Sequence, residues 1–416
     1  MLDKSPFLKS ILLLTSGSFL AQSITALSMP ILTRMYAPEV MGKYTYIISV
    51  AAIFLSVING RYDVSIVTEK KEEYVFPLIK LCLVVGILVA ATASLSFGGY
   101  FYFSGRETWM AVYVFLILLS YSLIDVFTAF NNREKDYKTI SSVYVIRTAF
   151  QSLGGILGGL SFANVHCLTL PYAIGLFAGL KRQARPLRNR IREILSVSWS
   201  EVINVAKIHR KQPIFSAPAL LANSLSYSLI TILLESLYGL EQVGYYAISV
   251  RLLGLPLALV GSNVSKVYLE RASKEFNSTG QYYTTFKKTF SFLLIIAIPI
   301  VFVLFFTATP ICTIVLGKNW AEAGRFIVIL APMFGVRLIT SVMSPSFVIV
   351  KKQRMELILQ SLFVLSNLLT YFVAKFLQFD IYEYLKILSI LFSSSYSLYL
   401  FMIFFYSEKR NSIWQK

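Results

Sequence analysis

Long apolar runs without any charged side chain recur along the whole sequence. Seven of them contain no Asp, Glu, Lys or Arg, and they cover 10–33, 44–60, 81–105, 212–234, 289–317, 357–374 and 387–407. A helix needs about 20 apolar residues to cross a bilayer core. A soluble helical protein would instead carry polar residues at helical spacing on one face of each helix. The runs therefore predict membrane-spanning helices.

Five further apolar stretches contain one charge or end in one. They cover 109–130, 139–161, 164–180, 244–265 and 326–350, which brings the predicted number of spans to twelve. Composition agrees, because only 14% of the 416 residues are charged and 56% are apolar, too few charges to cover a soluble protein. The first run is read as a retained span, since it is long for a signal peptide and has no obvious small-residue cleavage site. The predicted fold class is an all-α polytopic membrane protein with about 12 transmembrane helices in two six-helix lobes around a central cavity.

The positive charges are distributed unevenly between alternate loops. With the N-terminus taken as cytoplasmic, 29 of the 39 Lys and Arg residues fall on that side and seven on the other. Cytoplasmic loops of membrane proteins carry such an excess. The count predicts that both termini are cytoplasmic. It also explains the net charge of +18 by topology and contact with anionic lipids, so no nucleic-acid partner is expected.

The sequence divides into two similar halves joined by a basic segment. Tyr, Glu, Gly and Tyr of the stretch 36–44 recur in 238–246 at a constant offset of 202 residues. An offset of six helices preserves orientation, as in parallel-repeat transporters. We expect an N-lobe at 1–180, a linker at 181–211 and a C-lobe at 212–416. The linker has apolar residues at helical spacing among nine Lys and Arg, which predicts an amphipathic helix on the cytoplasmic leaflet.

Ionisable residues inside predicted spans are costly in a bilayer and are candidates for function. Five arginines are predicted at different depths, where guanidinium groups would suit an anionic cargo. They are Arg34, Arg61, Arg147, Arg251 and Arg337. Arg34 and Arg61 lie at helix ends, where a side chain can also reach the headgroups, so both interpretations stay open for them.

The candidate acids for a coupling ion are fewer than the arginines. Asp63, Asp125 and Glu235 fill this role in the prediction, although each could instead be the ion-pair partner of an arginine. The three cysteines are far apart, and neither histidine has metal-like spacing. We expect no catalytic residue, no bound metal and no cofactor.

Several short motifs resemble one family of transporters. They are Leu32-Thr33-Arg34-Met35-Tyr36-Ala37-Pro38, Arg61-Tyr62-Asp63, Gly244-Tyr245-Tyr246-Ala247 with Arg251, and Leu330-Ala331-Pro332 with Arg337. These are similar to Wzx-type O-antigen flippases of the multidrug/oligosaccharidyl-lipid/polysaccharide exporter superfamily. The resemblance implies two lobes that open alternately in the bacterial inner membrane. It implies an undecaprenyl-pyrophosphate-linked oligosaccharide for lipopolysaccharide as cargo, a coupling ion such as a proton or sodium, and contacts with other polysaccharide-assembly proteins.

Two other classes of protein remain as alternatives. A drug or metabolite cation antiporter of the same superfamily would share the architecture but would need an acidic cavity. A membrane glycan polymerase would need catalytic acids or arginines in long extracytoplasmic loops. The predicted outer loops are short and contain no DxD or HExxH pattern, so we expect a transporter and not an enzyme.

Overall fold

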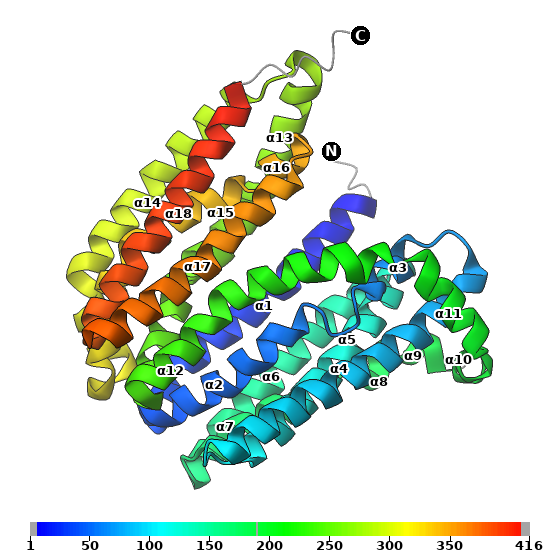
Figure 1. The fold of residues 1–416 in the computed structure, drawn as a ribbon, viewed down its shortest axis with the longest axis horizontal. Helices are drawn as coiled ribbons and strands as arrows, with labels where there is room; N and C mark the ends of the chain where they lie inside the picture. Colours follow the sequence, from blue (N-terminus) through cyan, green and yellow to red (C-terminus); the bar gives the residue numbers. More distant parts are fainter. Residues whose placement is uncertain (1–5, 189, 409–416) are drawn as a thin grey trace. The chain divides into compact units, whose positions relative to one another are not determined.

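The computed structural model describes residues 6–188 and 190–408, and within these ranges the chain forms helices and no strand. Figure 1 shows the course of the chain through these helices. Contacts within the chain divide it into two compact units, Met1–Ser228 and Leu229–Lys416. Lys4 and the C-terminal Lys409, Arg410 and Lys416, which the charge count includes, lie outside the described residues.

The first unit contains six long helices. They are α1 (Pro6–Met35), α2 (Pro38–Leu55), α4 (Val75–Phe103), α5 (Trp109–Arg133), α6 (Tyr137–Ser161) and α7 (Val165–Phe177). The short helices α3 (Tyr62–Thr68) and η1 (Glu72–Tyr74) connect α2 to α4. Among the closest neighbours, α1 lies along α6, α4 along α5, and α6 along α7.

The basic segment after α7 is folded against this unit. It forms four short helices, α8 (Leu180–Gln183), α9 (Arg185–Arg188), α10 (Ile191–Ser196) and α11 (Trp199–Ile208). Leu187, Val202 and Val205 are buried in one apolar cluster with residues of α3, α4 and α5. The single amphipathic helix predicted for the linker is wrong in form, because the helix is interrupted between these pieces and part of its apolar face is used for packing within the protein.

Among the described residues, six long helices reach or form the second unit, with shorter helical segments between them. After η2 (Gln212–Ser216), the helix α12 (Ala217–Leu253) enters it and is kinked at Gly239, whose φ of 82° lies in the left-handed region. Then follow η3 (Leu257–Gly261), α13 (Ser262–Thr279), α14 (Tyr283–Ile311), η4 (Cys312–Leu316) and η5 (Lys318–Trp320). The last helices are α15 (Ala321–Met343), α16 (Ser346–Ile349), α17 (Gln353–Leu377) and α18 (Ile381–Glu408).

All twelve predicted spans overlap helices of the described residues, and the all-helical membrane fold is confirmed. Seven helical segments among the described residues are long and apolar enough to cross a membrane by themselves. The other segments are shorter or more polar; α7 has only 13 residues, and α6 contains Arg147. The span predicted at 44–60 ends earlier than expected, because α2 stops at Leu55 and the chain turns before α3.

The sequence repeat marks the same feature in each half. Tyr36 lies at the break between α1 and α2, and Tyr238 directly precedes the kink at Gly239. Each tyrosine hydroxyl donates to a backbone carbonyl in or just after the fifth helix of its half. The Tyr36 hydroxyl lies 2.7 Å from the Gly155 oxygen, and the Tyr238 hydroxyl lies 3.0 Å from the Phe379 oxygen. The repeat therefore preserves one structural contact.

Candidate functional site

The break between α2 and α3 is held in an unusual backbone conformation. Gly60 and Arg61 both have positive φ, 58° and 62°. A positive φ is ordinary for glycine but uncommon for a residue with a side chain, and it persists only where the surroundings fix it. The backbone at Arg61 therefore interrupts a predicted span. At membrane depth, irregular backbone is tolerated only where it is buried in protein or lines a cavity.

A buried polar pair fixes this break to the neighbouring helices. The Ser122 hydroxyl of α5 donates to the Asn59 side-chain oxygen at 2.7 Å, and the Asn59 amide donates to the Ser122 carbonyl at 3.2 Å. Gly86 of α4 lies against the pair, since a Cβ there would be 1.8 Å from the Ser122 hydroxyl oxygen. Only glycine fits at this position without moving the pair.

Charged side chains gather beside this pair. Arg61 and Asp63 form an ion pair with 3.9 Å between guanidinium nitrogen and carboxylate oxygen. Asp125, one turn beyond Ser122 on α5, interacts electrostatically with Arg61, Asp63 and Arg147. The cluster of these two arginines and two aspartates (the charge cluster) comes from α3, α5, α6 and the α2–α3 break. Asp63 could be either a coupling-ion ligand or an ion-pair partner by sequence, and in the structure it lies at ion-pair distance from Arg61.

Arg147 of α6 is held by a residue that the sequence analysis did not consider. Its guanidinium donates to the side-chain oxygen of Gln183 at 2.6 Å, and both residues are buried. The Gln183 amide in turn donates to the Thr128 hydroxyl at 2.6 Å. The Asn131 amide donates to the Gln183 carbonyl at 2.7 Å. Gln183 thus connects the start of the linker to α5 and α6.

The interior of this unit contains buried polar atoms without a hydrogen-bond partner. They are the Nε atoms of Arg61 and Arg147, the hydroxyl oxygens of Ser65 and Ser94, and the Asn131 side-chain oxygen. Buried polar atoms in native proteins are almost always paired with protein, water or ligand. Two of the five are N–H donors of cations, which are suited to oxygen atoms of an anion. The charge cluster therefore has chemistry left over for a ligand.

The remaining predicted residues lie elsewhere. Arg34 is in the last turn of α1 with an exposed side chain. In the second unit, Arg251 is exposed in the last turn of α12, and Glu235 is half-buried on the same helix. Arg337 is half-buried on α15, with its guanidinium 5.1 Å from the centre of the Phe334 ring. The hypothesis that the five arginines act on one cargo at different depths stays a prediction.

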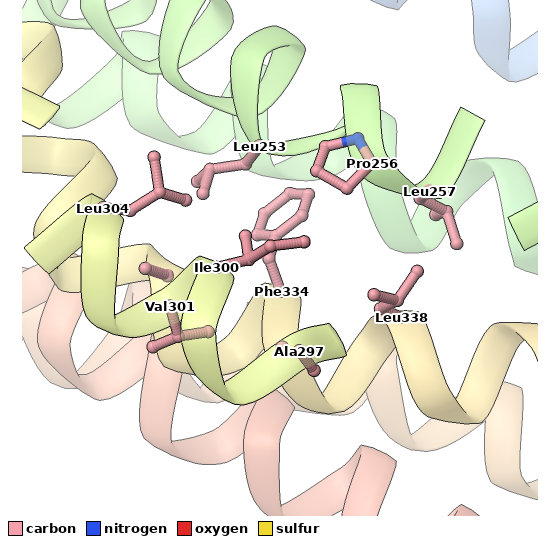
Figure 2. Close-up of a pocket in the computed structure, with 11 residues that line it drawn as sticks. Leu253, Pro256, Leu257, Ala297, Ile300, Val301, Leu304, Phe334 and Leu338 are labelled. Carbon is pink, nitrogen blue, oxygen red and sulfur yellow. The ribbon is translucent and has the colours of Figure 1, made fainter. Parts of the chain in front are cut away.

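The second unit contains apolar hollows. A cavity of about 20 Å³ lies between the end of α12, α14 and α15. Figure 2 shows the Phe334 ring among Leu253, Pro256 and Ile300. A wider groove of about 390 Å³ lies on α14 and α15, and residues such as Phe302, Phe305 and Val336 line it. The small cavity has room for about one water molecule and none for a charged cargo.

Among the described residues, no group of three or more His, Cys, Asp and Glu could hold a metal ion.

Sequence reasoning missed Asn59, Ser122 and Gln183. Gln183 lies in the basic run Lys181–Arg185, and this pattern is typical of a solvated surface. Uncharged polar residues within spans are also common at helix contacts, so nothing in the sequence separated these three from the others.

Comparison with known proteins identifies a family and a fold. The family model described as polysaccharide biosynthesis protein matches residues 31–325. No curated protein matches the chain. An inward-facing transporter of the multidrug MATE family, in the MOP superfamily, aligns with a TM-score of 0.71 at 12% identity and covers 93% of both chains.

Two further solved structures have the same architecture. The lipid II flippase MurJ in an inward closed conformation has a TM-score of 0.70 at 15% identity, over 94% of this chain and 87% of its own. A MOP superfamily transporter from Pyrococcus furiosus, described as having a binding pocket of reverse polarity, has a TM-score of 0.63 at 14% identity, over 95% and 94%. At these identities the likeness shows the fold alone, which is a multi-pass helical membrane fold. Since the family match covers more than half of the sequence, the chain belongs to the polysaccharide biosynthesis protein family.

Proposed function

We propose that this protein is a flippase for lipid-linked oligosaccharides. Its cargo is an undecaprenyl-pyrophosphate-linked O-antigen unit for lipopolysaccharide, which it moves from the cytoplasmic to the periplasmic leaflet of the bacterial inner membrane. One observation carries the proposal: in a member of the polysaccharide biosynthesis family, Arg61 and Arg147 each keep a buried Nε–H group without an acceptor. The protein moves this cargo without a chemical step, so it is not an enzyme.

The chemistry of such a cargo explains why arginines are needed. A pyrophosphate and a glycan cannot cross hydrocarbon unaided, whereas a lipid tail can stay in the bilayer. Guanidinium groups bind phosphate oxygens in a two-pronged geometry. Asp63 forms an ion pair with Arg61, and Asp125 interacts electrostatically with Arg61 and Arg147. In the proposed transport, phosphate oxygens replace the carboxylates as partners while the protein opens alternately to either leaflet.

Arg34, Arg251 and Arg337 extend this role in the proposal to other depths of the cavity. The test is a complementation assay for surface polysaccharide in cells that lack the native flippase, normalised to folded protein by fluorescence in detergent. Arg251→Ala and Arg337→Ala should each abolish surface glycan with the protein retained. The corresponding Lys variants should keep part of the activity, because charge survives while the two-pronged geometry is lost. Full activity in both Ala variants would remove the second unit from the proposal.

Ion coupling is assigned to the acids Asp63, Asp125 and Glu235. Each carboxylate would bind and release a proton or a sodium ion as the cargo arrives and leaves. The measurement is cargo translocation in proteoliposomes under an imposed proton or sodium gradient. If neither gradient changes the rate in the unmodified protein, ion coupling is excluded.

The direction of transport depends on the orientation of the chain. Both termini and the linker are assigned to the cytoplasm on the charge asymmetry. Ser104 and Ser196 are both exposed, in the α4–α5 loop and at the end of α10. In intact cells, an impermeant thiol reagent should label Ser104→Cys and spare Ser196→Cys. The reverse pattern would invert the orientation.

A cation antiporter of the same superfamily is the second candidate. The structural likeness to a multidrug transporter and the two aspartates of the charge cluster favour it. Such a protein would bind a lipophilic cation more tightly when Arg61 or Arg147 is neutralised. A lipid-linked anion would be bound more weakly by the same variants, so one binding series separates the two functions. A glycan polymerase, the remaining alternative, would produce longer glycans from purified lipid-linked units.

A further inference from the structure

The basic segment has a second apolar face that the protein does not cover. On α11, Val202 and Val205 are buried against the bundle, whereas Trp199 and Ile203 are 59% and 52% exposed. On α10, Ile191 and Leu195 are 50% and 70% exposed. In each helix the two exposed apolar residues are one turn apart and lie on one side. These four side chains are called the outer stripe.

The outer stripe is bordered by positive charge. All nine Lys and Arg side chains of the segment 181–211 are exposed, against two acids, Glu193 and Glu201. Glu201 is engaged locally, because it caps the start of α11 by bonding to Ser198. Arg192 follows Ile191 directly, and Lys207 lies one turn beyond Ile203. An apolar stripe with cations beside it is typical of a helix that lies in the surface of an anionic membrane.

The position of the outer stripe along the bundle matches the headgroup region. Figure 1 shows α10 and α11 grouped with α3 at one end of the first unit. Lys80 of α4 donates to the Val197 carbonyl at 2.6 Å, and its ammonium lies 5.4 Å from the centre of the Trp199 ring. The first strongly exposed apolar side chain of α4 is Ile87, seven residues on, or about 10 Å at the rise of a helix. Trp199 therefore lies near the boundary of the apolar surface of α4, where tryptophan is enriched in membrane proteins.

We propose that the outer stripe is a lipid-binding surface that inserts into the headgroup layer of an anionic leaflet, with phospholipid as its partner. The segment is then attached on two sides. Val202 and Val205 hold it to the bundle, and the outer stripe and the basic side chains hold it to the membrane. The proposal concerns lipid contact alone, so it stands or falls independently of the cargo.

The test uses the full-length protein in proteoliposomes, with Cys82, Cys167 and Cys312 replaced by alanine. A spin label is placed at Ile203→Cys in the outer stripe or at Asn204→Cys, which is exposed on another side of the same helix. Collisions with oxygen report the apolar region, and collisions with a water-soluble nickel chelate report water. The label at residue 203 should show a several-fold higher ratio of oxygen to nickel collisions than the label at residue 204. Equal ratios, or a 203 label shielded from both reagents, would overturn the proposal.

The second arm examines charge. Phosphatidylglycerol added to phosphatidylcholine vesicles should raise the oxygen-to-nickel ratio at residue 203, and Arg192→Gln with Lys207→Gln should remove that increase. An unchanged ratio in the two lipid compositions would exclude an anionic partner. Where a cysteine variant does not fold, the fluorescence of Trp199 replaces the spin label. The difference in fluorescence between the unmodified protein and Trp199→Phe gives the signal of Trp199. Brominated lipid chains should quench this signal. Lack of quenching would contradict insertion.

Discussion

The two units of this protein share a helical plan, but their interiors differ. In Met1–Ser228, the charge cluster, the Asn59–Ser122 pair and the Arg147–Gln183 contact lie inside the bundle. In Leu229–Lys416, the largest buried side chains include Trp320, Phe347 and Phe392. Many polar contacts there are hydroxyls bonded to backbone, as between Ser249 and Ala323 at 2.8 Å.

This difference suggests that one unit uses buried charges to bind a ligand and the other uses apolar packing for rigidity. Buried charges cost free energy and persist where they are paired or used by a ligand. Apolar and aromatic packing gives a rigid body without such a cost. We therefore expect substitutions in the charge cluster to affect transport, and substitutions of the apolar and aromatic core of the second unit to affect mainly stability. The following changes test that division, beginning with the largest expected effect.

Replacing Arg61 should abolish surface glycan. Arg61→Gly keeps the left-handed backbone, which glycine adopts freely, and removes the whole side chain with its guanidinium. Loss of a charged hydrogen bond to cargo corresponds to about 1.5–3 kcal/mol, or about tenfold or more in transport. The complementation assay measures it. The control is Arg325→Ala in the second unit, an exposed partner of Glu322 whose loss should be nearly silent. Normal glycan in Arg61→Gly would contradict the proposed role of the charge cluster.

Adding a methyl group at Gly86 should destabilise the first unit. Gly86→Ala places a Cβ against Ser122 and Asn59, and overpacking of this kind costs about 1–3 kcal/mol. Gly99→Ala is the matched control on the same helix, because no atom lies within 4 Å of its Cβ. The control should be neutral or slightly stabilising, since alanine favours helix over glycine. Thermal unfolding in detergent compares the two, and equal midpoints would show that the Asn59–Ser122 pair is not fixed as described.

Replacing Gln183 should lower stability by a similar or smaller amount. Gln183→Leu removes the acceptor of Arg147 and the donor to Thr128, and a hydrogen bond to a charged group contributes about 1.5–3 kcal/mol. Gln183→Glu keeps an acceptor and adds an ion pair, so it should unfold nearer to the unmodified protein. The neighbouring Arg182→Gln, on an exposed side chain, serves as the control. If Gln183→Leu and Arg182→Gln unfold at the same temperature, the linker is not anchored through Gln183.

The smallest effect is expected from a pH-dependent contact of His209, at the C-terminal end of the linker. The Glu69 carboxylate accepts the backbone N–H groups of Lys71 and Lys70 and lies 2.9 Å from His209. The Lys71 N–H, followed by the Lys70 N–H and His209, holds the pKa of Glu69 below its usual range. A lowered folded-state pKa stabilises the protein above the usual value of about 4.3, and this contribution is lost as pH falls through the folded value.

Glu69→Gln should therefore remove about 1 kcal/mol or less at neutral pH and flatten the stability profile only in acid. Unfolding midpoints measured from neutral pH to below pH 4 check this. Glu73, which is exposed and paired only with Lys71, provides the control as Glu73→Gln. A profile that stays as steep in Glu69→Gln as in the unmodified protein would assign the acid sensitivity to other carboxylates.

The sequence by itself determined the membrane fold of this protein. Hydrocarbon admits only apolar helices of sufficient length, so the uncharged runs such as 289–317 could be located without a structure. The same physics singled out Arg147 and Asp125, because a charge inside such a run stands out. The sequence left the role of Asp63 open between a coupling-ion ligand and a partner of an arginine.

Only the tertiary structure decided what those charges contact. Gln183 bonds to Arg147 of α6 and to Asn131 of α5 because the linker folds onto the bundle, and residues so far apart in sequence carry no mark of their proximity. The break at Arg61 was also hidden, since the run 44–60 reads as one continuous span. Hydropathy indicates whether a segment lies in lipid or in water. The partner of a polar group depends instead on how the helices pack. That packing is determined by many residues that are far apart in the sequence.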